Sequence, residues 1–515
     1  MQKISTLILT LLILLPLSIS AQGRRFLRYN CIAPTANNPS SPSGDKRGAP
    51  RMLPTIKTQW DSTRVYPIAV VLVQFNDKTF SSEAPQDRYN RMFNEEGYNE
   101  GVGPGCVAEY FRCQSGGLFK PQFDVYGPVT IDKGYKDNGS HGANSFVQAT
   151  RLLADSLLQA DSLNTDFSRY DWDNDGRAEA FIYVYAGYGG NESSNKVEGC
   201  IWPNTGTFST VTLPTLQEEQ PTITLRDYSA SAELWSSDRS CGIGTICHEY
   251  THSLGLPDIY PTSGSEYSVC DEWDLMDGGN FINDGWCPCN YSVHAKMLMG
   301  WLEPEELAEP ADIDSLKPLA DGGKAYIIRT ESSNEFFLLE NRQWNGWDLR
   351  TPGHGLLISH VDYDASLWSG NRVNTQADHH HYDLVHADNL SYTEWEEIFS
   401  KGNQYIGGHS RYLSGTPYPL LTDSIENRAL TDESLPAATT FSGTELLGKP
   451  ITAITENDDA TISFLFMGGD PLGIRNLSPL TTHHSPLTYD LMGRPITSPS
   501  YRGLVIKQGK KYIIQ

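Results

Sequence analysis

The stretch CHEYTHSLGLPDIY, residues 247–260, limits the possible fold and function of this chain more than any other part of its sequence. His248 and His252 stand four positions apart, so on a helix both rings lie on one side and can reach a single tetrahedral metal ion. Glu249 lies next to them, close enough to take a proton from a water molecule at such an ion. A second face of this helix is predicted to be apolar, because four residues recur at helical spacing: Ile243, Cys247, Tyr250 and Leu254.

A metal site of this kind needs a third protein ligand, and two residues compete for that role. Glu272 stands twenty positions after His252 and would serve if a second helix carried it. Asp258 would serve if Gly255 ended the first helix in a left-handed turn, with Pro257 preventing its continuation. The residues around Glu272, VCDEWDLMDGGN, are poor helix formers, so we favour Asp258. The third interpretation is a solvent-facing helix that matches the motif by chance.

The N-terminus, residues 1–21, is predicted to be a cleaved signal peptide. Its apolar run from Leu7 to Leu17 is too short to cross a bilayer and is followed by small residues. Residues 22–65, rich in Pro, Ser and Asn, are expected to be a pro-segment or linker. No other segment reaches eighteen consecutive apolar residues, so we expect a soluble protein without a membrane span, secreted or at the cell surface. The formal net charge of -24, from 63 acidic and 39 basic residues, disfavours nucleic acid as a partner.

The chain is long enough for several domains, and its pattern changes near residue 310. Before that point, two strand-like runs, YPIAVVLVQF (66–75) and EAFIYVYAG (179–187), flank a helical pattern with Phe146, Ala149, Leu153 and Leu157 on one face. They predict an α/β domain over residues 66–310. After it, short strand candidates such as AYIIR, FFLLE, GLLISH and ATISFLF predict a β-sandwich over residues 318–467. A Gly-Gly-Asp-Pro break at 468–471 precedes a compact tail, residues 475–515.

Nine cysteines in an exported chain suggest disulfides, with one cysteine left over. The near pairs are Cys106 with Cys113 and Cys241 with Cys247. The expected odd one is Cys31. This cysteine is free or disulfide-bonded, or it occupies the open position of the metal in an inactive precursor.

The string HEYTHSLGLPDIY followed by WDLMDGG resembles the metzincin arrangement HExxHxxGxxH/D with a methionine turn, and in particular the M6, immune-inhibitor-A-like, secreted metallopeptidases. The likeness extends, in order, to VVLVQFND (70–77), AEYFRCQSGGLF (108–119), the WDNDGRAEAFIYVYAG region, HAKMLMGWLEP (294–304), FFLLENRQ and GLLISHVDY. It therefore covers residues 66–467. The extra cysteines, including Cys247, depart from what the family leads us to expect.

The resemblance implies an α/β (α+β) metzincin-like catalytic domain and a β-rich region after it. It also implies a zinc-dependent endopeptidase that acts on proteins or peptides. Glu249 would be the catalytic base, and Met276 would provide an apolar floor beneath the metal. Tyr291 is a candidate for the catalytic tyrosine of some metzincins, although a core tyrosine is the simpler interpretation. The three residues that would hold Zn²⁺ are His248, His252 and Asp258.

A second cation site is predicted in RYDWDNDGRAE, where oxygen ligands stand at the spacing of a calcium loop and Gly176 occupies the sharp turn. The family resemblance also leads us to expect Ca²⁺ sites, and an exposed acidic turn without an ion is the alternative. The four predicted calcium ligands are Asp171, Asp173, Asp175 and Glu179.

The histidine run in ADHHHYDLVHAD, residues 377–388, invites the hypothesis of a further metal site. Three consecutive histidines cannot all face one ion from a strand. We therefore predict a solvated loop at this place.

The tail resembles the end of the sorting domains used for type IX secretion, which would make the secretion machinery a partner. A plain β-rich appendage is the alternative. For the whole chain, the rival function is a catalytically inactive surface binding or adhesion protein that retains the metal site. Glu249, which a binding module would not need, favours the enzyme.

Overall fold

The structure of the protein is a computed structural model. It describes residues 60–161, 165–191, 197–235, 238–263, 269–400, 409–443 and 445–469, and four short strands beyond them. The predicted signal peptide, nearly all of the segment 22–65, and Cys31 lie outside the described residues.

The first part of the chain forms a mixed α/β layer structure around one six-stranded sheet. Its strand order is β2-β1-β3-β5-β4, with β6 paired to β5; the first four strands are parallel and β4 is antiparallel to β5. The strands are β1 (Tyr66–Phe75), β2 (Pro121–Ile131), β3 (Phe181–Tyr188), β4 (Asn204–Pro214), β5 (Thr222–Trp235) and β6 (Arg239–Ser240). The strands predicted at 66–75 and 179–187 are thus confirmed.

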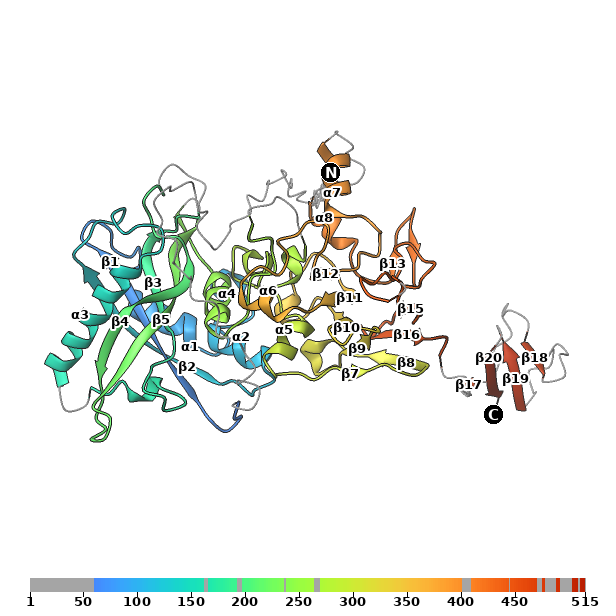
Figure 1. The fold of residues 1–515 in the computed structure, drawn as a ribbon, viewed down its shortest axis with the longest axis horizontal. Helices are drawn as coiled ribbons and strands as arrows, with labels where there is room; N and C mark the ends of the chain where they lie inside the picture. The colour runs from blue at the N-terminus through green and yellow to red at the C-terminus, as the bar shows by residue number, and fades with distance from the viewer. Residues whose placement is uncertain are drawn as a thin grey trace, which may run out of the picture.

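Helices cover both faces of this sheet (Figure 1). Side chains of β1 alternate between two apolar clusters: Ile68 and Val70 face one, and Ala69 and Val71 face the other. A strand buried on both sides needs a continuous apolar run, as this one has. One face carries α3 (Ala143–Asp161), whose predicted apolar side packs on the sheet. The other face carries three helices: α1 (Pro85–Asn94), α2 (Val107–Gln114) and α4 (Gly244–Ser253).

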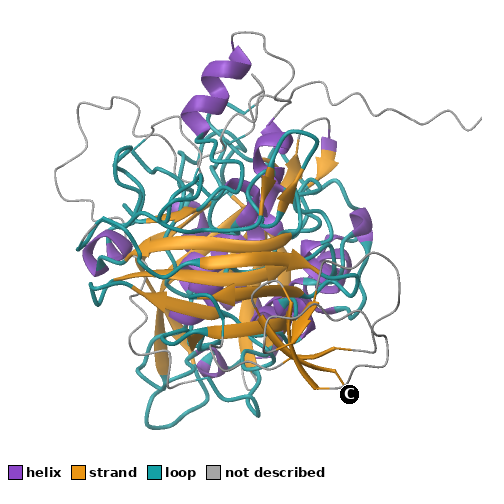
Figure 2. Ribbon diagram, turned by 90° about the vertical axis from the view of Figure 1, so that its right-hand side faces the viewer, coloured by secondary structure: helices purple, strands orange, loops and turns teal. Residues whose placement is uncertain are grey.

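The second part of the chain is rich in short strands, as predicted, and forms two further sheets with a common core. One has the order β12-β11-β10-β9-β7 and the other β15-β16-β8. Figure 2 views the molecule from the end that carries them. The larger sheet contains β7 (Glu305–Glu306), β9 (Tyr326–Arg329), β10 (Glu335–Arg342), β11 (Gly355–Asp362) and β12 (Tyr382–Leu384). The smaller contains β8 (Ala311–Leu316), β15 (Ile451–Glu456) and β16 (Ile462–Phe466).

The larger of these sheets has two buried faces. Phe337 and Leu339 of β10 pack with the smaller sheet, whereas Phe336 and Leu338 join the same apolar cluster as the residues of α2 and α4. The core of the first part of the chain therefore continues without a break into the second part. Shorter elements complete this region: α5 (Val293–Leu298), α6 (Ala365–Ser369), α7 (Tyr392–Ser400), α8 (His409–Ser414), β13 (Leu420–Leu421) and β14 (Glu426–Asn427).

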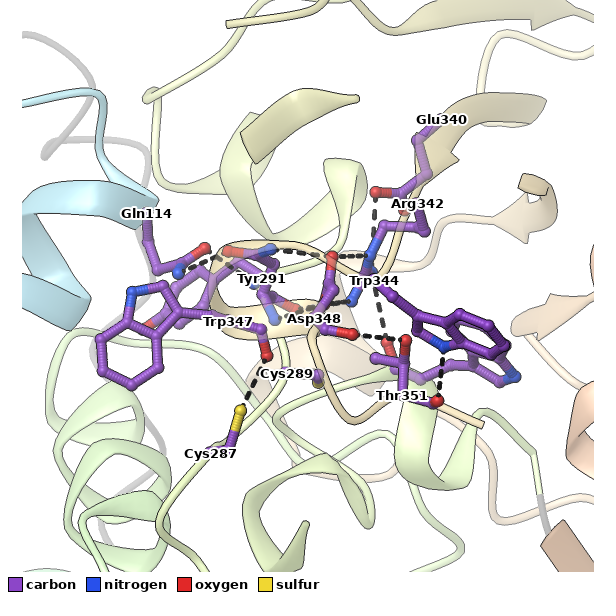
Figure 3. A network of polar contacts seen from close by, with 12 residues as sticks. Gln114, Cys287, Cys289, Tyr291, Glu340, Arg342, Trp344, Trp347, Asp348 and Thr351 are labelled. Carbon is purple, nitrogen blue, oxygen red and sulfur yellow. Dashed lines mark hydrogen bonds and ion pairs between the residues drawn. The ribbon is translucent and has the colours of Figure 1, made fainter. Parts of the chain in front are cut away.

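A buried ionic network joins the two parts (Figure 3). Arg342 of β10, 1% exposed, donates through Nε and Nη2 to the two carboxylate oxygens of Asp348 at 2.6 Å each. Asp348 also accepts from the backbone N–H and the side-chain amide of Asn290, at 2.9 and 2.8 Å. Gln114, at the end of α2, donates to the Asn290 side chain at 2.8 Å. Charge and amide groups thus connect β10 to the helices of the first part.

The described tail residues form a four-stranded sheet of their own, in the order β17-β20-β19-β18. The strands are β17 (Arg475–Leu477), β18 (Thr488–Asp490), β19 (Gly503–Lys507) and β20 (Lys510–Ile514). Within the described part of the chain, no helix combines the length and the apolar character needed to cross a membrane.

The predicted disulfide pairings are wrong, because Cys106, Cys113 and Cys247 are free thiols. Cys106 caps the start of α2 and Cys113 lies in its last turn. Seven residues of helix separate their Cα atoms by about 10 Å, beyond the reach of a disulfide. Cys247 is buried in the cluster that includes α2 and α4, while Cys241 packs against the cluster on the opposite face of the sheet.

Replacing Asp348 by Ala leaves Arg342 without its bidentate partner inside the core. We expect the free energy of unfolding to fall by about 3–5 kcal/mol, measured by urea denaturation. The control is Glu305→Ala, which removes the exposed ion pair with Lys324 and costs at most about 1 kcal/mol. Equal losses in the two variants would contradict a stabilising role for the network.

Candidate metal centre

Helix α4 lies between the first sheet and α2, and no part of it is exposed. The four apolar residues predicted to face the core, Ile243, Cys247, Tyr250 and Leu254, all belong to the cluster shared by the two parts of the chain. This burial excludes a solvent-facing helix. A helix buried on all sides can keep polar side chains only where they meet partners.

The helix ends at the predicted glycine. Gly255 has a φ of +109°, a conformation that L side chains rarely adopt. Its N–H donates to Thr251 O and His252 O, at 3.1 and 2.9 Å, which satisfies two of the last carbonyls of the helix. The chain then turns back, and Asp258 lies over the histidine edge of α4.

The structure brings His248, His252 and Asp258 together as a group that could hold a metal ion. Asp258 Oδ1 lies 3.3 Å from His248 Nε2 and 3.1 Å from His252 Nε2. All three side chains are buried. Glu272 lies on a short 3-10 turn, Asp271–Trp273, and is not a member of this group.

Backbone carbonyls fix the orientation of both histidine rings. Nδ1 of His248 lies 2.8 Å from Leu275 O, and Nδ1 of His252 lies 2.7 Å from Leu256 O. Each Nδ1 therefore carries a hydrogen and donates it, so in the neutral imidazole Nε2 is the nitrogen that presents a lone pair to the group. This is the tautomer that a metal ligand requires.

The buried Met276 lies in the turn directly after Leu275. Its N–H donates to Asp274 Oδ1 at 2.8 Å, and its carbonyl accepts from Ile259 N at 2.8 Å. The methionine turn is thus joined to His248 on one side and to the Asp258 segment on the other.

The charges of the group depend on one another. Burial disfavours ionisation of Asp258, but His252 and His248 outweigh it and hold the pKa of Asp258 well below its usual range. Burial also disfavours the charged form of His252, yet Asp258 raises the pKa of His252 to about 9. The site therefore favours positive charge next to the Asp258 carboxylate.

Glu249 lies beside the group and is held by the edge strand β4. Thr205 Oγ1 donates to Glu249 Oε2 at 2.9 Å and also contacts Glu249 O at 2.5 Å. Burial raises the pKa of Glu249, against the opposing charges of His248 and His252. One carboxylate oxygen is therefore anchored to β4.

Three buried polar atoms at this place have no hydrogen-bond partner: His248 Nε2, Asp258 Oδ1 and Glu249 Oε1. Leaving such atoms unsatisfied is costly unless another group meets them. Two imidazole nitrogens and one carboxylate oxygen are a donor set that suits zinc. The residues present therefore fit a metal ion with a nearby carboxylate that can accept a proton.

Asn371, just after α6, takes part in the site and was not found from the sequence. Its side-chain N–H donates to Asp258 Oδ2 at 2.7 Å, and its Oδ1 accepts from Asp258 N at 2.7 Å. A few residues on, the buried Asn374 donates to Ile259 O at 2.8 Å. No sequence signal joins Asp258 to a residue 113 positions away.

Three of the four predicted calcium ligands lie close together. Asp171, Asp173 and Asp175 come together as one group, but Glu179 is not part of it. Asp171 accepts from the N–H groups of Asp175 and Gly176, at 3.1 and 2.9 Å, which shapes the turn. Gly176 has a φ of +85°, as its place in the turn requires.

Tyr291 is a core residue. Its side chain is 1% exposed, its hydroxyl bonds to Thr251 Oγ1 on α4, and its ring packs on Trp301 and Tyr110. The tyrosine thus supports the helix that carries the histidines.

The solvated loop predicted at 377–388 is wrong in part: residues 377–381 do lie in a loop, and Ala377 and Asp378 are exposed, but the rest is not solvated loop. His381 and His386 are buried, and Tyr382–Leu384 form strand β12. This strand pairs with the end of β11. The pairing brings His381, directly before β12, next to Asp362 at the end of β11.

A fold of sheet and helices with a buried His, His and Asp group beside a glutamate fits the class of metal-dependent hydrolases. The comparison with known proteins narrows this class. Residues 66–299 match the family described as "Immune inhibitor A peptidase M6, catalytic domain".

The curated proteins to which the chain is similar include an immune inhibitor A and a metalloprotease. The chain is 23% identical over 305 residues to immune inhibitor A of Bacillus thuringiensis subsp. alesti, covering 51% of this chain and 44% of that protein. It is 22% identical over 311 residues to the pre-pro-metalloprotease PrtV of Vibrio cholerae serotype O1, covering 51% of this chain and 33% of that protein. The chain thus matches less than half the length of each relative. Together these likenesses support a metallopeptidase, and such a peptidase implies a metal, typically zinc.

Replacing Asn371 by Ala removes both hydrogen bonds that hold Asp258. We expect the zinc affinity at His248, His252 and Asp258 to fall about 10–100-fold, measured by competition with a chromogenic chelator. Ser369→Ala, which alters only an exposed contact in the helix just before Asn371, is the control and should match the unmodified protein. Equal zinc affinity in both variants would contradict a positioning role for Asn371.

Proposed function

We propose that this protein is a secreted zinc-dependent endopeptidase that hydrolyses peptide bonds of extracellular proteins. The observation that carries the proposal is the placement of Glu249: one oxygen is bound by Thr205 and the other is unpartnered beside the His248, His252 and Asp258 group. A purely structural metal site needs its ligands but no free carboxylate next to them.

In the proposed reaction, the metal ion and the side chains of the protein have different roles. His248, His252 and Asp258 would hold zinc, which when bound polarises the carbonyl of the scissile bond and acidifies water. Glu249 takes a proton from the attacking water at Oε1 and delivers it to the nitrogen of the leaving amine. Thr205 keeps the other oxygen in place during both transfers. Asn371 holds Asp258 in the orientation that ligation needs.

The place of β4 favours an extended polypeptide as the substrate. Among the described strands, β4 pairs only with β5 and stands at the end of the sheet, so its outer edge is open to a further strand. An extended peptide can add to such an edge through main-chain hydrogen bonds. Thr205 lies on this strand and contacts Glu249, so a peptide bound along β4 would come close to the base.

The proposal also includes the fold type of each part of the chain and the role of the tail. The first part of the chain would be of metzincin type, with Gly255 ending the ligand helix and Met276 beneath the metal. The strands of 318–467 would form a β-sandwich, supported by the core that the two sheets share. The tail would direct the protein through type IX secretion to the outside of the cell.

Glu249→Gln tests the proposed base. We expect casein hydrolysis to fall at least about 100-fold because proton transfer is lost, while zinc binding is retained because no ligand changes. Glu272→Gln is a matched control, since Glu272 is not in the group, and should hydrolyse casein at the unmodified rate. Full activity in Glu249→Gln, or an unmodified protein that a zinc chelator does not inhibit, would reject the endopeptidase. Failure of the unmodified protein to cleave casein would favour the inactive binding protein.

We also propose a calcium ion at Asp171, Asp173 and Asp175. Hard carboxylate oxygens that converge from alternate positions of one tight turn suit this cation. Isothermal titration should show calcium binding to the full chain and its loss in Asp173→Ala. Identical titrations before and after the substitution would reject the site.

A further inference from the structure

Strand β4 pairs regularly with β5 over only part of its length. From Asn204 to Thr207, each residue of β4 stands opposite the next residue of β5. The register then shifts: Thr207 is opposite Asp227, and the next paired residue, Val211, is opposite Leu225. Because β4 advances four positions while β5 advances two, two additional residues lie in β4. Such a bulge bends a strand and interrupts its ladder of hydrogen bonds.

The bulge is fixed by the core of the protein. Phe208 and Val211 are both buried in the apolar cluster that includes α3, and the ring of Phe208 stacks on Tyr228 with centroids 5.5 Å apart. In a regular strand, residues three positions apart point to opposite faces of the sheet. The bulge lets both side chains reach the same core and leaves Ser209 and Thr210 exposed. It is therefore a built feature of the strand and not a frayed end.

The start of β4 is closed in a different way. Trp202, two positions before the strand, donates its N–H to Ser140 O at 2.7 Å. Pro203 has no N–H to donate. The side chain of Asn204 donates to Trp202 O at 2.6 Å and to His141 O at 3.3 Å, which holds this turn in place. Neither residue before Asn204 can therefore donate a backbone hydrogen to a bound peptide.

The regular stretch between these two limits, residues 204–207, lies next to the candidate base. Thr205 is its second residue and donates to Glu249 Oε2. In the described part of the sheet, no strand pairs with the outer side of β4. A peptide that pairs with residues 204–207 and continues past Thr207 meets the bulge, where the backbone groups no longer follow the spacing of a strand. Residues 211–214 beyond the bulge cannot extend the same ladder.

We propose that the substrate pairs with β4 over residues 204–207 only, and that the bulge after Thr207 sets this limit. The inference rests on the proposed endopeptidase. It assigns the substrate as a short extended segment that the enzyme binds at β4 through the peptide main chain. In a ladder, alternate residues bond to the same neighbouring strand. About half of the paired substrate residues therefore donate an N–H to β4.

The first experiment measures the length of the paired segment on the unmodified full chain. Fluorogenic peptides are built around a bond that the enzyme cleaves in casein and are lengthened by one residue at a time on either side. On the side that pairs with β4, we expect kcat/KM to rise up to about four residues, the length of the regular stretch, and then to stay constant.

The second experiment removes one substrate N–H at a time by replacing a peptide bond with an ester. Each ester at a position that donates to β4 should lower kcat/KM about 2–10-fold. These positions should alternate and should all lie within the paired segment. An ester farther from the scissile bond on that side should have no effect.

A deletion tests the role of the bulge itself. Removing Ser209 and Thr210 together takes out the two additional residues, so the ladder should lengthen and the plateau in kcat/KM should move to longer peptides. The matched control replaces the same two residues by alanine, which keeps the chain length and should keep the plateau. Circular dichroism checks that both variants fold, and the ester series on the unmodified chain decides if the deletion variant does not.

Three results would overturn the inference. One is an unmodified chain on which esters have the same effect at every position or no effect at any. Another is a plateau that the deletion and the alanine control share. If either occurs while casein is cleaved, the limit at the bulge is wrong and the endopeptidase stands. A chain that cleaves neither casein nor any peptide would contradict the endopeptidase, and the inference with it.

Discussion

The structure depends on the burial of one carboxylate. Asp258 is fully buried, and a buried ionised carboxylate is tolerated only where positive charge and hydrogen bonds surround it. The amide of Asn371 supplies a hydrogen bond, and His252, whose pKa Asp258 raises, supplies positive charge. One oxygen is oriented by Asn371, and the other is directed to the histidine nitrogens. The same arrangement that makes the carboxylate tolerable in the core also places it to serve as the proposed metal ligand.

Several distant segments must be in register for this arrangement to exist. The histidines come from a helix fixed by its apolar face, and Asp258 comes from the turn that Gly255 permits. The methionine turn joins His248 to the Asp258 segment, and Asn371 comes from the second part of the chain. The apolar cluster common to both parts, with the Arg342 and Asp348 pair, keeps that second part in place. The strand-rich region is therefore structurally part of the site.

Local features of the fold could be predicted from the sequence because they depend on neighbouring residues. The strand at Tyr66–Phe75 follows from its apolar run, and the core face of α4 follows from the spacing of Ile243, Cys247, Tyr250 and Leu254. The stop at Gly255 follows from its conformational freedom.

Features that depend on distant contacts could not be predicted. Asn371 gives no local signal, because its role lies in a contact across 113 residues. The pairing of Cys106 with Cys113 fails because a helix separates them. Strand β12, directly after the histidine run, was expected to be a loop, because its pairing with β11 is a contact between distant segments.

Anomalous diffraction at the zinc absorption edge, from crystals of the full chain, tests the central claim most directly. The account predicts a peak about 2.0–2.2 Å from His248 Nε2, His252 Nε2 and an oxygen of Asp258, with Glu249 beside it and not bound to it. A zinc-loaded crystal with no peak between these three residues, or with Glu272 in place of Asp258, would contradict it.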